Sequence, residues 1–194
     1  TAGVGTLTYY DPETGGYGAL GHAITDVDTG VRFPVGEGAV YENEVVSITR
    51  GSRGTPGELT GAFFEQETEL GSIEHNTDFG VFGSASETLG ESELYPDGLP
   101  VALRDEVHAG RAAILASVDG QEVKEYDCEI EKVYNQSQPE TRSMVVRITD
   151  PELLERTGGI VQGMSGSPIV QDGKLVGAVT HVLINDPARG YGVF

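Results

Sequence analysis

The sequence is poor in several residue types, and each shortage narrows what the chain can be. It has no tryptophan, 12 lysines and arginines together, and one cysteine, Cys128, so no disulfide can form within it. A chain of 194 residues can bury a core large enough to fold without such a bond. The acidic neighbours Asp127 and Glu129 also disfavour the thiolate form that a cysteine nucleophile needs.

Long apolar runs are missing as well. No segment approaches the length of a membrane span, and no signal-peptide pattern opens the chain. The first residue is Thr1, so we expect the chain to be a fragment or a processed product of a longer protein.

Positive charge is scarce, because 31 acidic residues leave a net charge of −19. Such a surface repels the phosphates of nucleic acids, which excludes them as partners. The acidity fits a well-solvated surface, and it also fits a basic substrate or a salty environment.

Metal and nucleotide signatures are incomplete. Asp26, Asp28 and Glu37 have the spacing of a calcium-binding loop, but Val31 stands where that loop requires glycine. The Gly-x-Gly at 3–5 is followed by neither a helical pattern nor the final glycine of a dinucleotide site. We therefore expect no metal and no cofactor.

Glycine is frequent, at 28 residues, and short apolar stretches alternate with turn residues along the chain. This pattern predicts an all-β fold, either a barrel or a sandwich. One short helix is expected at 150–159, with Asp150 as its cap, Pro151 at its first position and glycine at its end. Turn formers near 97–100 predict a boundary between two lobes of a single domain, about 1–98 and 99–194. Strands are expected at 4–10, 40–49, 80–82, 112–118, 129–134 and 143–148, and in a hairpin at 167–179 that turns at Asp172 and Gly173.

The run Gly-Met-Ser-Gly-Ser-Pro at 163–168 has the residue types of a nucleophile turn. Glycines on both sides of Ser165 allow a sharp bend and the close approach of a substrate. Such a bend can aim the N–H groups of Gly163 and Ser165 at one point, which is how an oxyanion hole is built. The run alone is a weak signal, but the hairpin behind it makes Ser165 a specific candidate nucleophile.

A serine turn followed by a hairpin resembles the chymotrypsin-like peptidases. The segments 18–26, 54–59 and 163–186 together resemble the SpoIVB sporulation peptidases, family S55, over most of the chain. The resemblance implies a chymotrypsin-like double β-barrel with one or two short helices and a serine endopeptidase activity. Met164 stands where trypsin-like enzymes carry the aspartate that pairs with a new amino terminus, so activation by that ion pair is not expected.

A serine hydroxyl needs an adjacent base, and the chain has four histidines. The resemblance assigns the base to His22, and the alternative is a histidine that only satisfies a turn. We interpret His181 as structural or substrate-lining. His75 and His108 lie in polar, acidic surroundings and are expected at the surface.

The third catalytic residue should be a carboxylate that orients the imidazole. The resemblance points to Asp150, although in the chymotrypsin pattern the acid lies in the first barrel. Asp150 is also the expected helix cap, which gives its carboxylate a competing role. Asp26 and Asp28, close to His22 in the sequence, are the other candidates.

The resembled fold binds extended substrate along a strand that follows the nucleophile. Thr180, His181 and Val182 are the expected substrate-binding residues, and 190–192 would form another wall of the side-chain pocket. Asp186 either faces that pocket and selects a basic residue or lies in a solvated turn.

These features give the hypothesis of a serine endopeptidase that cleaves a protein or peptide, with His22, Asp150 and Ser165 as catalytic residues. The resemblance implies a regulatory cut in a membrane-associated substrate during sporulation, outside the cytoplasmic membrane, in the intermembrane space of the developing spore. It also implies a PDZ domain upstream. Two alternatives stay open: a quality-control peptidase of exported proteins, and an inactive double barrel that serves as a binding module.

Overall fold

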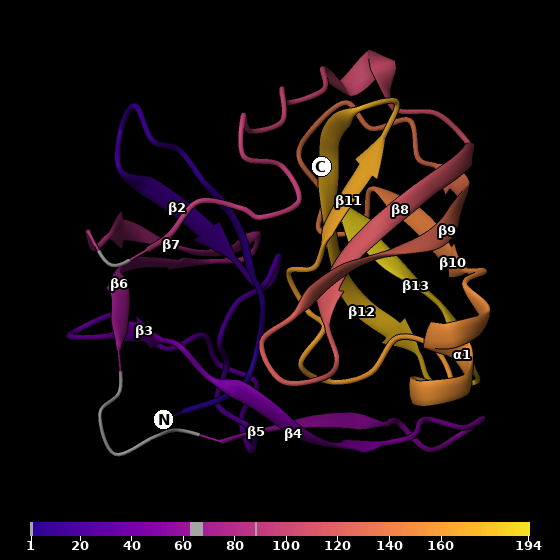
Figure 1. Cartoon of the computed structure of the whole chain (residues 1–194), viewed down its shortest axis with the longest axis horizontal. Coiled ribbons are helices and arrows are strands. Elements are labelled where there is room, and N and C mark those ends of the chain that lie inside the picture. The colour runs from indigo at the N-terminus through magenta and orange to yellow at the C-terminus, as the bar shows by residue number, and fades with distance from the viewer. Residues whose placement is uncertain (1, 63–67, 88) are drawn as a thin grey trace.

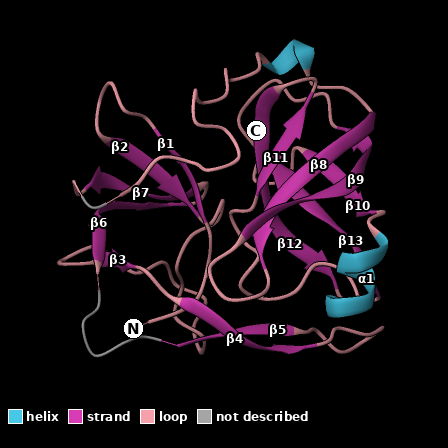
Figure 2. Cartoon of the chain, viewed as in Figure 1, coloured by secondary structure: helices cyan, strands magenta, loops and turns pink. Residues whose placement is uncertain are grey.

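Two lobes of antiparallel strands lie side by side in the computed structural model, which describes residues 2–62, 68–87 and 89–194 (Figures 1 and 2). The first lobe and its extension contain β1 (Leu7–Tyr10), β2 (Gly16–Ala19), β3 (Ala39–Tyr41), β4 (Glu44–Thr49), β5 (Glu58–Ala62), β6 (Glu69–Thr77) and β7 (Gly80–Ala85). A 3₁₀ turn, η1 (Arg104–Glu106), follows. The second lobe contains β8 (Gly110–Ser117), β9 (Val123–Val133), β10 (Met144–Ile148), α1 (Pro151–Thr157), β11 (Pro168–Gln171), β12 (Lys174–Leu183) and β13 (Asp186–Val193).

The second lobe is a closed barrel with the strand order β10-β13-β12-β11-β8-β9. Buried and exposed side chains alternate along β9, so one face of the strand lines the barrel core. Tyr126, Cys128 and Ile130 are buried, while Asp127 and Glu129 between them are exposed. The predicted hairpin is confirmed, since β11 pairs with β12 across a turn at Asp172 and Gly173. Both turn residues have positive φ, 52° and 72°, as a tight hairpin turn requires.

The first lobe is a five-stranded sheet with the order β1-β2-β7-β6-β3, and it does not close. The expected chymotrypsin-like double β fold is therefore confirmed, with one complete barrel and one half-barrel. β2 ends at the seam between the lobes, close to the start of the loop that carries His22.

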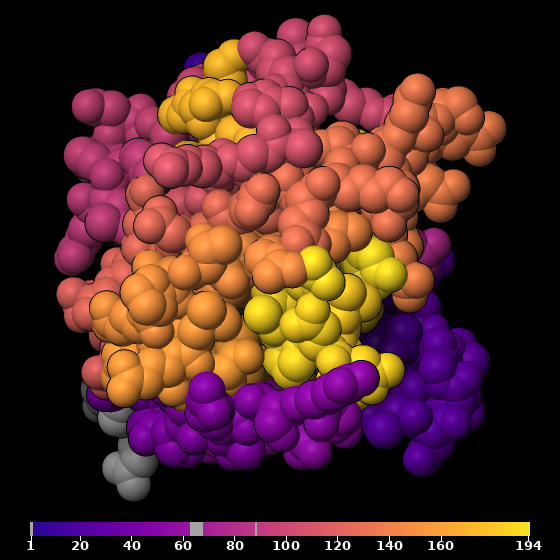
Figure 3. Space-filling view, turned by 90° about the vertical axis from the view of Figure 1, so that its right-hand side faces the viewer, coloured from indigo at the N-terminus to yellow at the C-terminus, as the bar shows by residue number. Residues whose placement is uncertain are grey.

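The strand predicted at 40–49 is wrong, because the chain breaks at 42–43 and its two halves pair with different partners. β3 joins the first sheet through β6, whereas β4 pairs with β5 as a ribbon beneath the second barrel (Figure 3). The ribbon is bonded to that barrel: Val45 and Gly120 exchange two backbone hydrogen bonds, and Leu59 is buried in the barrel core. The segment that precedes the predicted lobe boundary thus contributes to the second lobe.

The predicted helix is confirmed as α1, capped by Asp150 at its start and by Gly158, with φ 77°, at its end. Among the described residues, no helix is long and apolar enough to cross a membrane.

Candidate active site

Ser165 lies at the seam between the lobes, in the turn that leads from α1 to β11. Its side chain is half-buried, and its hydroxyl donates to the carbonyl of Thr180 on β12 at 3.0 Å. Its own carbonyl accepts from the amide of Thr6 in the first lobe at 2.9 Å. The next residue, Gly166, has φ 91°, and a side chain there would lie 2.3 Å from the Thr6 carbonyl. Only glycine fits this close crossing of the two lobes.

Two amides of the turn, those of Gly163 and Ser165, donate no hydrogen bond within the described part of the chain. All their neighbours do, at 2.8–3.1 Å: the amides at 162, 164, 166 and 167 donate to the carbonyls of Gly57, Val161, Val179 and Met164. The exceptions are the pair that the sequence predicts as the oxyanion hole. A peptide carbonyl that becomes an oxyanion could accept both.

The orientation of these two amides is fixed from behind. Because a trans peptide is planar, its N–H and C=O point in opposite directions, so holding one aims the other. The Gln162 carbonyl, opposite the Gly163 amide, accepts from Leu59 of β5 at 2.8 Å. The Met164 carbonyl, opposite the Ser165 amide, accepts from the Ser167 amide at 3.0 Å. The directions of the Gly163 and Ser165 amides are therefore fixed in the absence of substrate.

His22 follows β2 and is half-buried at the same seam. Its Nδ1 lies 2.9 Å from the carbonyl of Ala23. Since a carbonyl only accepts, this bond assigns the proton of the neutral ring to Nδ1 and leaves the lone pair on Nε2. The preceding Gly21 has φ 68°, and a side chain there would lie 3.0 Å from the Thr180 side chain. Thr180 thus contacts the loop of His22 and also binds the Ser165 hydroxyl.

No hydrogen bond joins Ser165 to His22 in the described structure. Each side chain instead bonds a backbone carbonyl, that of Thr180 for the serine and that of Ala23 for the histidine. The structure therefore brings the predicted nucleophile and base to one place without pairing them. Rotation of the Ser165 side chain would release its hydroxyl from Thr180.

His181 packs against His22, with ring centroids 5.1 Å apart. Partial burial lowers the pKa of His181, and electrostatic interactions with His22 and Arg142 lower it further. His181 thus lies beside His22, and its predicted structural or substrate-lining role stays a prediction. His75 and His108 are exposed, which confirms their predicted surface positions.

Asp150 caps α1 and is occupied there. One carboxylate oxygen accepts from the amides of Glu152, at 2.9 Å, and Leu153, at 3.1 Å, and the other accepts from the Asp127 amide at 3.3 Å. It makes no hydrogen bond to His22 in the described residues. The structure does not bring these two predicted catalytic residues together, and the triad role of Asp150 stays a prediction.

Asp26, another candidate acid, is also engaged locally. It accepts from the hydroxyl and the amide of Thr29, at 2.7 and 2.8 Å, and these bonds lower the pKa of its carboxyl group. Asp28, the last of the three, makes no hydrogen bond to His22 in the described structure.

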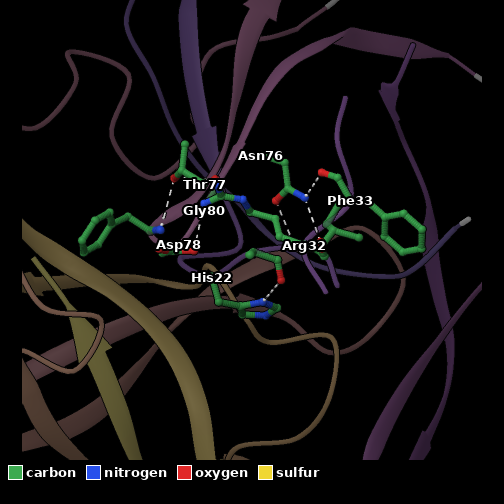
Figure 4. A network of polar contacts seen from close by, with 10 residues as sticks. His22, Arg32, Phe33, Asn76, Thr77, Asp78 and Gly80 are labelled. Atoms are coloured by element: carbon green, nitrogen blue, oxygen red, sulfur yellow. Dashed lines mark hydrogen bonds and ion pairs between the residues drawn. The ribbon is translucent and has the colours of Figure 1, made fainter. Parts of the chain in front are cut away.

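A carboxylate that the sequence reasoning missed, Asp78, lies in the β6–β7 turn beside the His22 loop (Figure 4). It is ion-paired with Arg32 at 2.9 Å. Gly80, at the end of the same turn, packs closely against the chain just before His22. A side chain at Gly80 would lie 2.6 Å from the carbonyl of Ala19 and 3.2 Å from the Gly21 amide. The run Asp78-Phe79-Gly80 forms this turn only because β6 pairs with β7, so the three residues alone do not predict where Asp78 lies.

Asn76, also on β6, fixes the other side of the His22 loop. Its side-chain amide accepts from the amide of Ile24 and donates to its carbonyl, both at 2.8 Å, and donates to the Phe33 carbonyl at 3.0 Å (Figure 4). The loop that presents His22 is therefore held by the first sheet.

The predicted substrate strand is the last part of β12. A side chain at Gly190 of β13 would lie 2.5 Å from the carbonyl of His181, so that carbonyl points towards β13. Backbone carbonyls alternate in direction along a strand, so those of Thr180 and Val182 point to the opposite edge, where Ser165 lies.

Asp186 begins β13 and is bonded to Arg189 at 3.2 Å. Arg189 also forms an ion pair with Glu131 of β9. The Asp186 carboxylate therefore belongs to a surface ion-pair network. On the neighbouring side, Ile160 fills the space next to Gly190, 2.5 Å from where a side chain would begin. Ile160 belongs to the barrel core, so this side of Gly190 faces that core.

A serine in a glycine-rich turn between two β lobes is the architecture of the chymotrypsin-like serine peptidases, which are hydrolases. The family comparison is more particular. The model of the SpoIVB peptidase S55 family matches residues 1–194, and the chain belongs to that family. Neither the curated proteins nor the solved structures contain a significant match to the chain.

Proposed function

We propose that Ser165 attacks the scissile carbonyl of a peptide while Nε2 of His22 accepts the hydroxyl proton. The imidazolium then returns that proton to the leaving amine, and a water molecule hydrolyses the acyl-enzyme with the same base. The amides of Gly163 and Ser165 stabilise the oxyanion of the tetrahedral intermediate in each of the two steps, acylation and deacylation. The observation that carries this proposal is the pair of free amides in a turn whose other amides are all bonded.

The hydrogen bond from Nδ1 of His22 to Ala23 supports the base role, because it leaves Nε2 unprotonated and able to accept. A carbonyl fixes the tautomer but carries no full negative charge to stabilise the imidazolium. Asp150 is the acid that the family resemblance proposes, and Asp78 is the carboxylate on the turn packed against the His22 loop. Substitution distinguishes the two.

We also propose that the substrate lies extended along Thr180, His181 and Val182. The outward carbonyls of Thr180 and Val182 would accept its amides, as in the addition of a strand to a sheet edge. The His181 ring would then contact a substrate side chain next to His22.

A fluorophosphonate probe tests the nucleophile and base. The folded wild type should be labelled at Ser165, Ser165→Ala should not be labelled, and His22→Gln should react more slowly by a factor of about 10³ or more. His108→Gln, an exposed histidine outside the site, is the matched control and should react like the wild type. Labelling that survives in Ser165→Ala would refute the assignment, and an unlabelled wild type would favour the inactive binding module.

Family membership supports a more specific role: a regulatory cut in a membrane-associated protein of sporulation, outside the cytoplasmic membrane, with an upstream PDZ domain selecting the substrate. A signalling peptidase should cut a folded extracytoplasmic domain at one site. A quality-control peptidase of exported proteins should instead cut an unfolded protein, such as reduced casein, at many sites. Mass spectrometry of both digests distinguishes these activities.

A further inference from the structure

We propose that Thr6 and Thr8 are positioning residues for catalysis. They form a strap, residues 6–8, that crosses from the first lobe and holds the back of the nucleophile turn. The inference rests on the proposed oxyanion role of Gly163 and Ser165.

The strap donates three hydrogen bonds, each to a different carbonyl of the nucleophile turn. The Thr6 hydroxyl donates to the carbonyl of Gly163 at 3.3 Å, the Thr6 amide donates to that of Ser165 at 2.9 Å, and the Thr8 hydroxyl donates to that of Gly166 at 2.7 Å. With the bonds from Leu59 and Ser167, every carbonyl from 162 to 166 has a donor. No peptide plane in this stretch is left free to turn.

Such restraint is needed because of the glycines. Gly163 and Gly166 have φ values of 97° and 91°, which glycine adopts easily but also leaves easily. A rotation of either neighbouring peptide would move the Ser165 amide or hydroxyl away from the position of the oxyanion. The strap opposes this rotation from a part of the chain about 157 residues away, the separation of Thr6 from Gly163.

The strap also sets the position of the base. The carbonyl of Thr6 accepts from the Leu20 amide at 3.1 Å, two residues before His22. Thr6 is therefore bonded to the nucleophile turn on one side and to the His22 loop on the other. This segment leads into β1, which lies beside β2 in the first lobe (Figure 2). Met164, in contrast, is fully buried in the barrel core and offers the turn no ionic anchor.

Thr→Val substitutions keep the side-chain shape and remove the hydroxyl donor. We expect Thr8→Val to lower the acylation rate by about 3- to 10-fold, and Thr6→Val with Thr8→Val by about 10- to 100-fold, as judged from single hydrogen-bond contributions. A peptide boronate, which mimics the oxyanion, should lose affinity by similar factors, while a product peptide should bind as before. Thr14→Val, which removes an exposed bond to Asp11, is the matched control and should change none of these quantities.

Thr8→Ser keeps the hydroxyl donor that Thr8→Val removes. Its acylation rate and its affinity for the boronate should therefore be close to those of the wild type. Unchanged acylation in the double variant would overturn the proposal, as would equal losses for boronate and product peptide. If Thr8→Val fails to fold, Thr8→Ser decides the matter: a folded Thr8→Ser protein with weak boronate binding would also overturn it. Hydrogen exchange at 163–166, expected to quicken in Thr8→Val, tests the strap even if the wild type shows no peptidase activity, so the two failures are distinguishable.

Discussion

Replacing Asp150 by serine separates its two possible roles. Serine is a good helix cap, so Asp150→Ser keeps an acceptor for the amides of Glu152 and Leu153 but removes the carboxylate. Asp150→Ala removes both. The hydrogen bonds of Asp150 in the structure lead us to expect that labelling of Ser165 in both variants stays within about tenfold of the wild-type rate, whereas loss of a triad acid lowers turnover by about 10⁴.

The stability of these variants is the second readout. Loss of the cap in Asp150→Ala costs about 1 kcal/mol, and loss of a negative charge at the start of α1 adds about 0.5 kcal/mol at a half-exposed site. For a chain of this size that corresponds to a fall in Tm of about 3–6 °C. Asp150→Ser should retain most of the wild-type Tm.

Differential scanning fluorimetry and fluorophosphonate labelling at 25 °C, well below Tm, measure the two effects on the same samples. A serine variant with normal Tm and labelling slowed a thousandfold would refute our reasoning. Such a result would assign Asp150 to the triad and require the α1 cap to rearrange during catalysis.

Three further predictions concern other titratable groups. Burial raises the pKa of the Cys128 thiol to about 12, so iodoacetamide at pH 8 should leave it unmodified in the native protein and alkylate it in urea; rapid native alkylation would contradict its burial. Hydrogen bonds to the Ala109 carbonyl and to Asp172 raise the pKa of His108 in the folded protein. The stability that this exposed contact contributes is therefore present below the unfolded-state pKa of about 6.5. It is lost as pH rises through the folded-state pKa. His108→Gln should accordingly lower Tm at pH 5.5 and leave it unchanged at pH 9, and an equal change at both would be inconsistent with this linkage. Asp78→Asn should slow labelling more than Asp150→Ser does, because the Asp78 turn packs on the His22 loop; the reverse order of rates would count against it.

Local sequence predicted those parts of the fold that local chemistry decides. The hairpin turn needs positive φ at Asp172 and Gly173, and the start and end of α1 need a capping carboxylate and a glycine, so each is readable from a few residues. The strand predicted at 129–134 covers only the second half of β9, whose buried and exposed residues alternate from Tyr126 to Ile130.

The missed elements depend on distant partners. β6 contains Glu69, Glu74 and His75 and has no strong apolar alternation, so its strand conformation comes from pairing with β3 and β7. The stretch 40–49 looks continuous, but its halves join different sheets. Because the pairing of β6 with β7 forms the turn with Asp78, the sequence alone gives no reason to place this carboxylate near His22.

The active site shows the same division between local and distant determinants. The run 163–168 predicts that a sharp turn can form, because glycine permits the φ values that the turn adopts. It does not predict that the turn holds one shape, since a glycine-rich segment has many conformations of similar energy. The restraint comes from Thr6, Thr8 and Leu59, none of which is near Ser165 in the sequence. An isolated turn would therefore contain the same residues without a fixed direction for the Gly163 and Ser165 amides, and the proposed catalytic geometry depends on the contact between the two lobes.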